Sequence, residues 1–376
     1  MFAWLEIDTG AIATNLATLA RIVAPARVAA VIKANAYGHG LEEVGRALDG
    51  QAARLCVYAL DEALALRAAG VRSRIQVIGP VAPPDLPAAH RAEVEVTVWD
   101  AGVYADELAA IALRTGVPFG VHIKLDTGVT RLGMRAEDAR PAIDRLLVKP
   151  GLRVLGIMSH LAAAEELDST YTTEQLARFH AAVDGVDPGI ERHIAASAAA
   201  MLWPQTRLDL IRAGIAVYGL WPSEPTRQIV EARGVELVPA LAWRTELVTV
   251  HEVPAETSVG YGCTYRTTRP SRIAVLPIGY AEGIPRARSN RGHVLVAGQR
   301  APLVGRVCMN MSFIDVTDIP EAQHNSRVTL IGTDGAEHIS AETFAEWSDT
   351  INYELVARLP AAIPRRFAAL PARGSA

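Results

Sequence analysis

Short runs of β-branched residues alternate with alanine- and leucine-rich segments of helical period over the first 220 residues. This alternation predicts strand–helix units and a parallel sheet. Strands are expected at 27–34, 54–60, 74–81, 94–99, 119–126, 153–160, 193–197 and 208–215. Eight such units are the number that closes a (β/α)8 barrel. An open doubly wound sheet is the alternative, but the segment after the first strand lacks the glycine spacing of a dinucleotide fingerprint. We therefore predict an α/β fold with a (β/α)8 TIM-type barrel.

The pattern changes after residue 235, where short alternating strands are separated by glycine- and proline-bearing turns. Strands are expected at 241–250, 272–277, 293–296, 301–307, 312–316 and 327–331, and the next helix at 341–347. The sequence thus predicts two domains, a barrel at 1–235 and a mostly β C-terminal domain at 236–376.

Composition narrows the choice of partner. The net charge of the 376-residue chain is −4, and no basic stretch is interleaved with aromatic residues, so neither nucleic acid nor a membrane surface is expected as a partner. No metal is predicted, because the three cysteines lie far apart without metal-ligand spacing. The N-terminus lacks a secretory signal pattern. We expect a cytoplasmic protein that acts on a small molecule.

Lysine is rare in this chain, because only three of its 37 basic residues are lysines. Lys33 and Lys124 each stand at the end of a predicted strand, whereas Lys149 follows a predicted helix and is typical of a charge at a helix C-terminus. Arginine can replace lysine on a surface, but its guanidinium stays protonated and cannot become a free amine. Lys33 and Lys124 are therefore candidates for amine chemistry.

Barrel enzymes carry their reactive groups at the C-terminal ends of the strands. Taken singly, a histidine, serine or glycine there is more often a core residue, a helix cap or a turn residue. Here several reactive types end successive strands at one mouth: Lys33, Lys124 with Arg131 in its loop, His160, Ser197, and Arg212 with Gly214. Their convergence predicts an active site at this mouth.

Motifs across both predicted domains resemble alanine racemase. They are AVIKANAYGHG at 30–40, VHIKLDTG at 121–128 with RLG at 131–133, GIMSH at 156–160, RAGIAVYG at 212–219, GYG at 260–262, PIGY at 277–280, GRVCM at 305–309 and TINYE at 350–354. The resemblance implies a pyridoxal 5'-phosphate enzyme whose barrel is followed by a β domain. It also implies a head-to-tail homodimer in which each active site includes residues of the partner.

The resemblance assigns roles to individual residues. Lys33, the pyridoxal phosphate lysine, and Tyr261, acting from the partner subunit, are implied to be the two catalytic bases. Cofactor binding is implied for Lys33, Tyr37, Arg131, His160, Ser197, Arg212, Gly214, Ile215 and Tyr353. Substrate binding is implied for Arg131, Met309, Tyr280 and Tyr353. Lys124 is implied to be carbamylated, which would relieve its repulsion with Arg131.

The function implied is interconversion of L-alanine and D-alanine, which supplies D-alanine for peptidoglycan. A racemase of the same fold acting on serine, lysine or another amino acid remains open, because Asn310 stands where the family usually has aspartate. A non-catalytic pyridoxal phosphate carrier and a decarboxylase are competing hypotheses. The C-terminal domain disfavours the carrier, and Arg212, standing where an acid would be expected, disfavours the decarboxylase.

Overall fold

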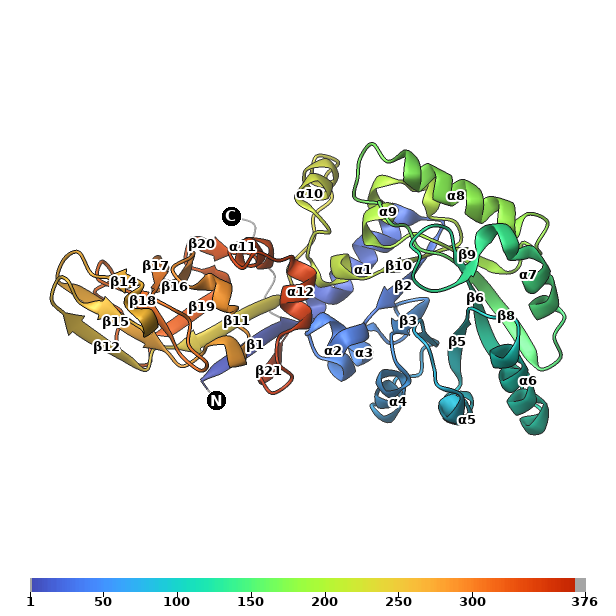
Figure 1. The fold of residues 1–376 in the computed structure, drawn as a ribbon, viewed down its shortest axis with the longest axis horizontal. Coiled ribbons are helices and arrows are strands. Elements are labelled where there is room, and N and C mark those ends of the chain that lie inside the picture. Colours follow the sequence, from blue (N-terminus) through green and yellow to red (C-terminus); the bar gives the residue numbers. More distant parts are fainter. Residues whose placement is uncertain (1, 369–376) are drawn as a thin grey trace. The chain divides into compact units, whose positions relative to one another are not determined.

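The computed structural model describes residues 2–368, which form two compact units. One unit, which we call the barrel unit, comprises Ala11–Ala36 and Leu41–Val238. The other, the β unit, comprises residues 2–10, Tyr37–Gly40 and residues 239–368 of the described chain. Figure 1 shows the barrel strands and their outer helices in blue to green, and the strands of the β unit mainly in yellow to red.

Eight parallel strands form the core of the barrel unit, in the order β10-β2-β3-β4-β5-β6-β8-β9. They are β2 (Arg27–Val31), β3 (Arg54–Val57), β4 (Ile75–Val77), β5 (Val94–Val98), β6 (Phe119–Asp126), β8 (Leu152–Met158), β9 (Glu191–His193) and β10 (Leu210–Ala213). The two ends of this sheet meet, because the Arg212 N–H donates to the Ala195 carbonyl at 3.0 Å. The predicted (β/α)8 barrel is confirmed.

Most helices of this part of the chain lie between consecutive barrel strands, whereas α1 (Thr9–Val23) precedes β2 and α10 (Glu224–Glu231) follows β10. Between the strands lie α3 (Leu41–Leu48), α4 (Leu60–Ala68), α5 (Leu86–Arg91), α6 (Val103–Thr115), α7 (Arg140–Leu147), α8 (Thr170–Val183) and α9 (Ser197–Leu202). Helix α8 begins after Ser169, whose hydroxyl accepts a hydrogen bond from the Thr172 N–H, and it buries Leu176 and Phe179. Within residues 2–368 no helix has both the length and the apolar character needed to cross a membrane.

The β unit is built on a largely antiparallel sheet in the order β12-β15-β18-β17-β16-β19-β11-β1-β21. Its strands are β1 (Ala3–Asp8), β11 (Leu241–Glu246), β12 (Thr249–Val253), β15 (Ser271–Leu276), β16 (His293–Val296), β17 (Gln299–Val304), β18 (Ser312–Asp315), β19 (Arg327–Asp334), β20 (Glu337–Ile339) and β21 (Arg365–Ala368). A small hairpin pairs β13 (Ser258–Val259) with β14 (Tyr265–Arg266), and two helices, α11 (Ala341–Glu346) and α12 (Asn352–Ala357), complete the unit.

Two features of this sheet differ from the sequence prediction. Strand β1 was not predicted; it pairs antiparallel with β11 and parallel with β21. The single strand expected at 241–250 is divided, because β11 pairs with β19 whereas β12 pairs with β15. The predicted domain ranges, 1–235 and 236–376, placed β1 with the barrel, although its hydrogen bonds lie within the β sheet; the ranges stay a prediction.

Candidate active site

The C-terminal end of the barrel gathers the side chains predicted from the strand ends. Lys33 follows β2, Lys124 lies in β6, His160 follows β8, and Arg212 lies in β10. Arg131 is in the loop after β6, and its charge lowers the pKa values of Lys33, Lys124 and His160, as expected of groups close together. The barrel thus brings this predicted set to one mouth.

Lys33 is half-buried at this mouth. Burial lowers the pKa of its amine, the nearby Arg131 charge lowers it further, and Glu62 opposes both effects. A lowered pKa increases the fraction of free amine, which is the form that attacks a carbonyl or accepts a proton. Lys33 therefore has the environment of a reactive lysine.

The backbone after Lys33 forms a left-handed turn, α2 (Lys33–Tyr37), in which residues 34–37 have φ between +52° and +55°. None of these residues is glycine, and each pays about 1–2 kcal/mol for this conformation. Side chains hold the turn: Asn35 Oδ1 accepts from the Leu41 N–H at 2.9 Å, and Glu62 Oε1 accepts from the Ala34 N–H at 2.6 Å. Strain maintained in this way is typical of functional sites, and here it fixes the backbone beside Lys33.

Arg212 is buried and held by a set of acceptors. Its Nη1 donates to His193 Nδ1 and to the His193 carbonyl, both at 2.9 Å, and its Nη2 donates to the Ser159 carbonyl at 2.6 Å. His160 Nδ1 lies 3.3 Å from the same Nη2. Burial lowers the pKa of Arg212 to about 10, so it is still a cation at neutral pH. Within residues 2–368 its Nε has no hydrogen-bond partner, which leaves one N–H group for a ligand.

Lys124 and His160 share the positive surroundings of this mouth. Burial lowers the pKa of Lys124 well below its usual value, and the charges of Arg212 and Arg131 lower it further. Burial, followed by the charge of Arg212, has the same effect on His160. Both side chains are therefore disposed to be neutral, and a neutral lysine amine is a nucleophile.

The loop that carries Arg131 is shaped by one carboxylate. Asp126 Oδ1 accepts from the backbone N–H groups of Gly128, Val129 and Thr130 at 2.8 to 3.1 Å, and Oδ2 accepts from the Arg131 N–H at 3.2 Å. These four bonds hold the chain in a tight turn at the end of β6. The backbone that carries the Arg131 side chain is thereby fixed at the end of β6.

Ser197 and Gly214 lie together at the ends of neighbouring strands. Ser197 Oγ accepts from the Gly214 N–H at 3.0 Å and from the Ala216 N–H at 3.5 Å. Gly214 precedes a short 3-10 helix that begins at Ile215. A hydroxyl beside neighbouring backbone N–H groups at the start of a short helix is suited to bind an anion such as a phosphate.

The β unit brings three further predicted residues to one pocket of about 800 Å3. Tyr261, Tyr280 and Met309 all line it. Tyr261 is 73% exposed in the single chain and Met309 is 57% exposed. The backbone fixes the spacing of Tyr280 and Met309, because the Tyr280 N–H donates to the Cys308 carbonyl at 3.0 Å and the Ala281 N–H donates to the Met309 carbonyl at 2.9 Å.

Asn310, which stands where the family usually has aspartate, also lines this pocket and contacts Glu282. Its Nδ2 donates to Glu282 Oε1 at 2.7 Å, and Glu282 Oε2 accepts from the Gly279 N–H. Two carboxylates at this separation would repel each other. Asn310 therefore suits the glutamate beside it.

Tyr37 and Tyr353 lie together in the β unit, with ring centroids 6.5 Å apart. Burial raises the pKa of Tyr37 to about 12, so its phenol stays protonated and can donate a hydrogen bond. Each of the two units thus assembles its own share of the predicted site residues.

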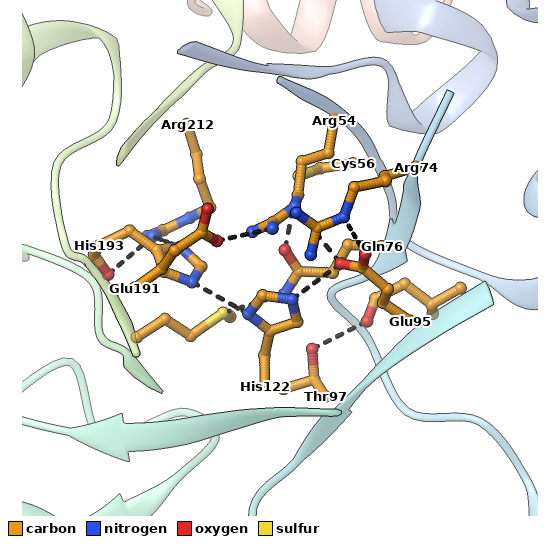
Figure 2. Close-up of polar contacts among 12 residues, drawn as sticks. Arg54, Cys56, Arg74, Gln76, Glu95, Thr97, His122, Glu191, His193 and Arg212 are labelled. Atoms are coloured by element: carbon orange, nitrogen blue, oxygen red, sulfur yellow. Dashed lines mark hydrogen bonds and ion pairs between the residues drawn. The ribbon is translucent and has the colours of Figure 1, made fainter. Parts of the chain in front are cut away.

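A buried polar network below the mouth was missed by the sequence analysis. Figure 2 shows Glu95, His122, His193 and Glu191, with Arg54 between the two carboxylates. The signal was available, because Glu95 and His122 are polar residues within strands that are mostly buried. Partners across a barrel depend on strand register, however, so the sequence does not show which polar residues meet.

Family models and individual relatives point to the same family. Residues 7–222 match the family model "Alanine racemase, N-terminal domain", and residues 240–367 match "Alanine racemase, C-terminal domain". The chain is 40% identical over 370 residues to the alanine racemase of Methanococcus maripaludis, covering 96% of this chain and 97% of that protein.

Solved structures agree with these sequence matches. A crystal structure of alanine racemase from Bacillus anthracis with bound L-Ala-P has a TM-score of 0.88 and 36% identity, covering 97% of this chain and 95% of that one. The alanine racemase from Bartonella henselae, crystallised with covalently bound pyridoxal phosphate, has a TM-score of 0.86 and 28% identity, covering 98% of this chain and all of that one. The predicted enzyme class, a pyridoxal phosphate-dependent racemase, is confirmed by these relatives. The chain belongs to the alanine racemase family.

Proposed function

We propose that this protein interconverts L-alanine and D-alanine with pyridoxal 5'-phosphate as its cofactor. The observation that carries the proposal is Arg212, a buried cation with five acceptor atoms within hydrogen-bond distance at the barrel mouth and its Nε–H left for a ligand. Pyridoxal phosphate, when bound, withdraws electrons from the amino acid's Cα and makes its proton acidic. An arginine facing the ring nitrogen donates a hydrogen bond but keeps its proton. It thus favours return of the Cα proton over side reactions.

The residues of the barrel mouth fit this cofactor. Lys33 supplies the amine for covalent attachment, and its lowered pKa favours the reactive form. Ser197 Oγ and the backbone N–H groups of Gly214 and Ile215 would hold the phosphate, together with the hydroxyls of Tyr37 and Tyr353. Arg131 and His160 would complete the set of cofactor contacts.

Racemisation requires proton transfer on both faces of the substrate. We assign one face to the Lys33 amine and the other to the phenol of Tyr261 of the partner subunit. Arg131 and the Met309 backbone N–H would hold the substrate carboxylate, and Tyr280 and Tyr353 would limit the size of the side chain. Size exclusion of this kind is modest, because one methylene is worth only about 1–3 kcal/mol.

Lys124 is proposed to carry a carbamate. Its low pKa supports the proposal, because the neutral amine reacts with carbon dioxide, forming an N–C bond and releasing one proton. The resulting anion would replace a repulsive charge beside Arg131 with an attractive one. It would then orient the Arg131 guanidinium toward the substrate.

A homodimer is proposed as the active form. Tyr261, Tyr280 and Met309 are exposed in the single chain and line one pocket of the β unit, which supports their use by a partner's site. A cytoplasmic location, and supply of D-alanine for peptidoglycan, complete the proposal.

Chiral analysis of the products tests the activity. The purified protein is offered each L-amino acid separately, and D-alanine should form from L-alanine until the two are equal. Faster racemisation of serine or lysine than of alanine would show that the preferred substrate is that other amino acid. A bound cofactor with no racemisation of any amino acid would indicate the non-catalytic carrier.

A further inference from the structure

A chain of hydrogen bonds runs through the barrel interior from a carboxylate to Arg212 (Figure 2). Glu95 Oε2 lies 2.8 Å from His122 Nε2, His122 Nδ1 lies 3.2 Å from His193 Nε2, and His193 Nδ1 lies 2.9 Å from Arg212 Nη1. All four side chains are buried. The hydrogen bonds therefore link the four side chains in the order Glu95, His122, His193, Arg212.

The two ends of this chain determine where its protons lie. A carboxylate only accepts hydrogen bonds, and a guanidinium only donates them. His122 must then donate from Nε2 to Glu95 and accept at Nδ1. His193 must donate from Nε2 to His122 and accept at Nδ1 from Arg212. Only one arrangement satisfies every bond: both imidazoles neutral, with the proton on Nε2.

The surrounding structure is built to fit this chain. Gly156 in β8 has no side chain, and a Cβ atom there would lie 2.7 Å from His122 Nδ1, the atom that meets His193. Burial, the largest influence, lowers the pKa values of His122 and His193, consistent with neutral rings. The second oxygen of Glu95 is occupied by Arg74 Nε at 2.5 Å, so Oε2 remains available for His122.

We propose that Glu95 is a positioning residue for Arg212, acting through the protonation pattern of His122 and His193. The proposal rests on the proposed function only in that Arg212 faces the cofactor. By fixing both tautomers, Glu95 presents an acceptor to Nη1 of Arg212, which helps to hold the guanidinium in place, while no residue of 2–368 bonds its Nε. An orienting carboxylate that sets a histidine tautomer is a known device in catalysis.

The variant Glu95→Gln is expected to reverse the direction of donation in the hydrogen bonds between residue 95 and Arg212. Arg74 can only donate, so the amide oxygen must face Arg74 and the amide NH2 must face His122. His122 would then accept at Nε2 and donate from Nδ1, and His193 would do the same. The His193 Nδ1–H would point at an N–H group of Arg212, and that hydrogen bond would be lost.

Glu191→Gln is the matched control. Glu191 is a second buried carboxylate of the same network, binding Arg54 at 2.6 Å and also pairing with Arg27. Within residues 2–368 no hydrogen bond joins it to either imidazole. Its replacement removes the same charge without changing the pattern of donors and acceptors along the chain.

The tautomers can be measured by NMR on cofactor-loaded protein labelled with 15N-histidine, with signals assigned from His122→Asn and His193→Asn. In the wild-type protein both imidazoles should be neutral with protonated Nε2 from pH 6 to 8. Glu95→Gln should move the proton to Nδ1 in both, whereas Glu191→Gln should leave it on Nε2. Wild-type His193 with a proton on Nδ1, or charged, would overturn the proposal even if no variant folds. Unchanged tautomers in a folded Glu95→Gln protein would do the same.

Activity provides a second readout. Glu95→Gln should lower kcat for alanine racemisation at least about tenfold with little change in KM, a loss of the size found when outer partners that orient metal-binding side chains are replaced. Glu191→Gln at equal stability should retain most of kcat. Equal losses of kcat in the two variants would show that the charge, and not the tautomers, matters, and would overturn the proposal. If the wild-type protein racemises nothing, the proposed function fails, while the tautomers remain measurable.

Discussion

Arg54 joins the two buried carboxylates of the barrel, and its replacement gives a stringent test of the network. It is fully buried; its Nη2 lies 2.6 Å from Glu191 Oε2, and its Nε lies 3.3 Å from Glu95 Oε2. Arg54→Met keeps the apolar part of the side chain and removes the charge. Both carboxylates then lose a buried cation.

The expected loss of folding stability depends on the cations that Glu95 and Glu191 keep when Arg54 is replaced. Breaking a buried ion pair by removing one member costs about 3–5 kcal/mol. Here the lower end, about 3 kcal/mol, is expected because Glu95 keeps Arg74 and Glu191 keeps Arg27. For a domain of this size each kcal/mol lowers Tm by about 2–4 °C, so the barrel transition should fall by about 6–12 °C.

The loss should depend on pH in a definite direction. Burial raises the pKa of Glu95, but the hydrogen bond and charge of His122, with Arg54 and Arg74, lower it to about 2. Because this value lies below the usual 4.5, ionised Glu95 stabilises the fold above pH 4.5, and this contribution is lost as the pH falls toward 2. Removing Arg54 raises the pKa of Glu95. The Tm difference between wild type and Arg54→Met should therefore narrow as the pH falls from 4.5 toward 2.

Calorimetry on the purified protein measures both effects. Arg153→Met is the control, because Arg153 is exposed on β8 and its loss should cost less than about 0.5 kcal/mol. Adding Glu191→Gln to Arg54→Met should recover part of the lost stability. An Arg54→Met protein as stable as wild type, or a Tm difference that does not change with pH, would refute the reasoning.

Three further outcomes are expected. Lys33→Ala should abolish covalent retention of pyridoxal phosphate after borohydride reduction, whereas Lys149→Ala should not, as peptide mapping would show. Tyr261→Phe should lower kcat/KM equally in both directions, since the equilibrium constant between L-alanine and D-alanine is 1. In deuterium oxide the variant should still exchange the Cα proton of D-alanine but hardly that of L-alanine. Equal exchange into both isomers would exclude a two-base mechanism. Gly38→Ala should lower thermal stability by about 3 kcal/mol, because Gly38 has φ +78° and its Cβ would lie 2.0 Å from the Val356 carbonyl oxygen.

Much of the barrel follows from the sequence because most of its strands are marked locally by buried apolar residues, although β9 (Glu191–His193) is not. The strand expected at 119–126 is β6 without a change in its bounds, and the strand expected at 94–99 ends one residue earlier. The site residues at strand ends could also be predicted from the sequence, since parallel strands in a barrel bring all these ends to one face. The roles of these residues came from the family resemblance and stay predictions.

Features that depend on distant pairing could not be predicted. Strand β1 carries the same local pattern as any strand, but its partners lie at the far end of the sequence. The contact of His122 with Glu95 and His193 depends on the register of neighbouring strands. The left-handed turn after Lys33 contains no glycine within 34–37, so the usual residue signal for positive φ is missing.

The position of β1 in its sheet has a consequence for synthesis on the ribosome. Ala3 pairs with Thr245 of β11, and Leu5 pairs with Arg365 of β21, so both neighbours of β1 are made long after it. At about 5–20 residues per second, β11 follows β1 after roughly 10–50 s. During that time the nascent chain exposes a strand with unpaired N–H and C=O groups, the kind of edge that recruits foreign strands. Productive synthesis of this protein should therefore depend on protection of its earliest segment, and slower translation should increase aggregation even though the barrel has already been made.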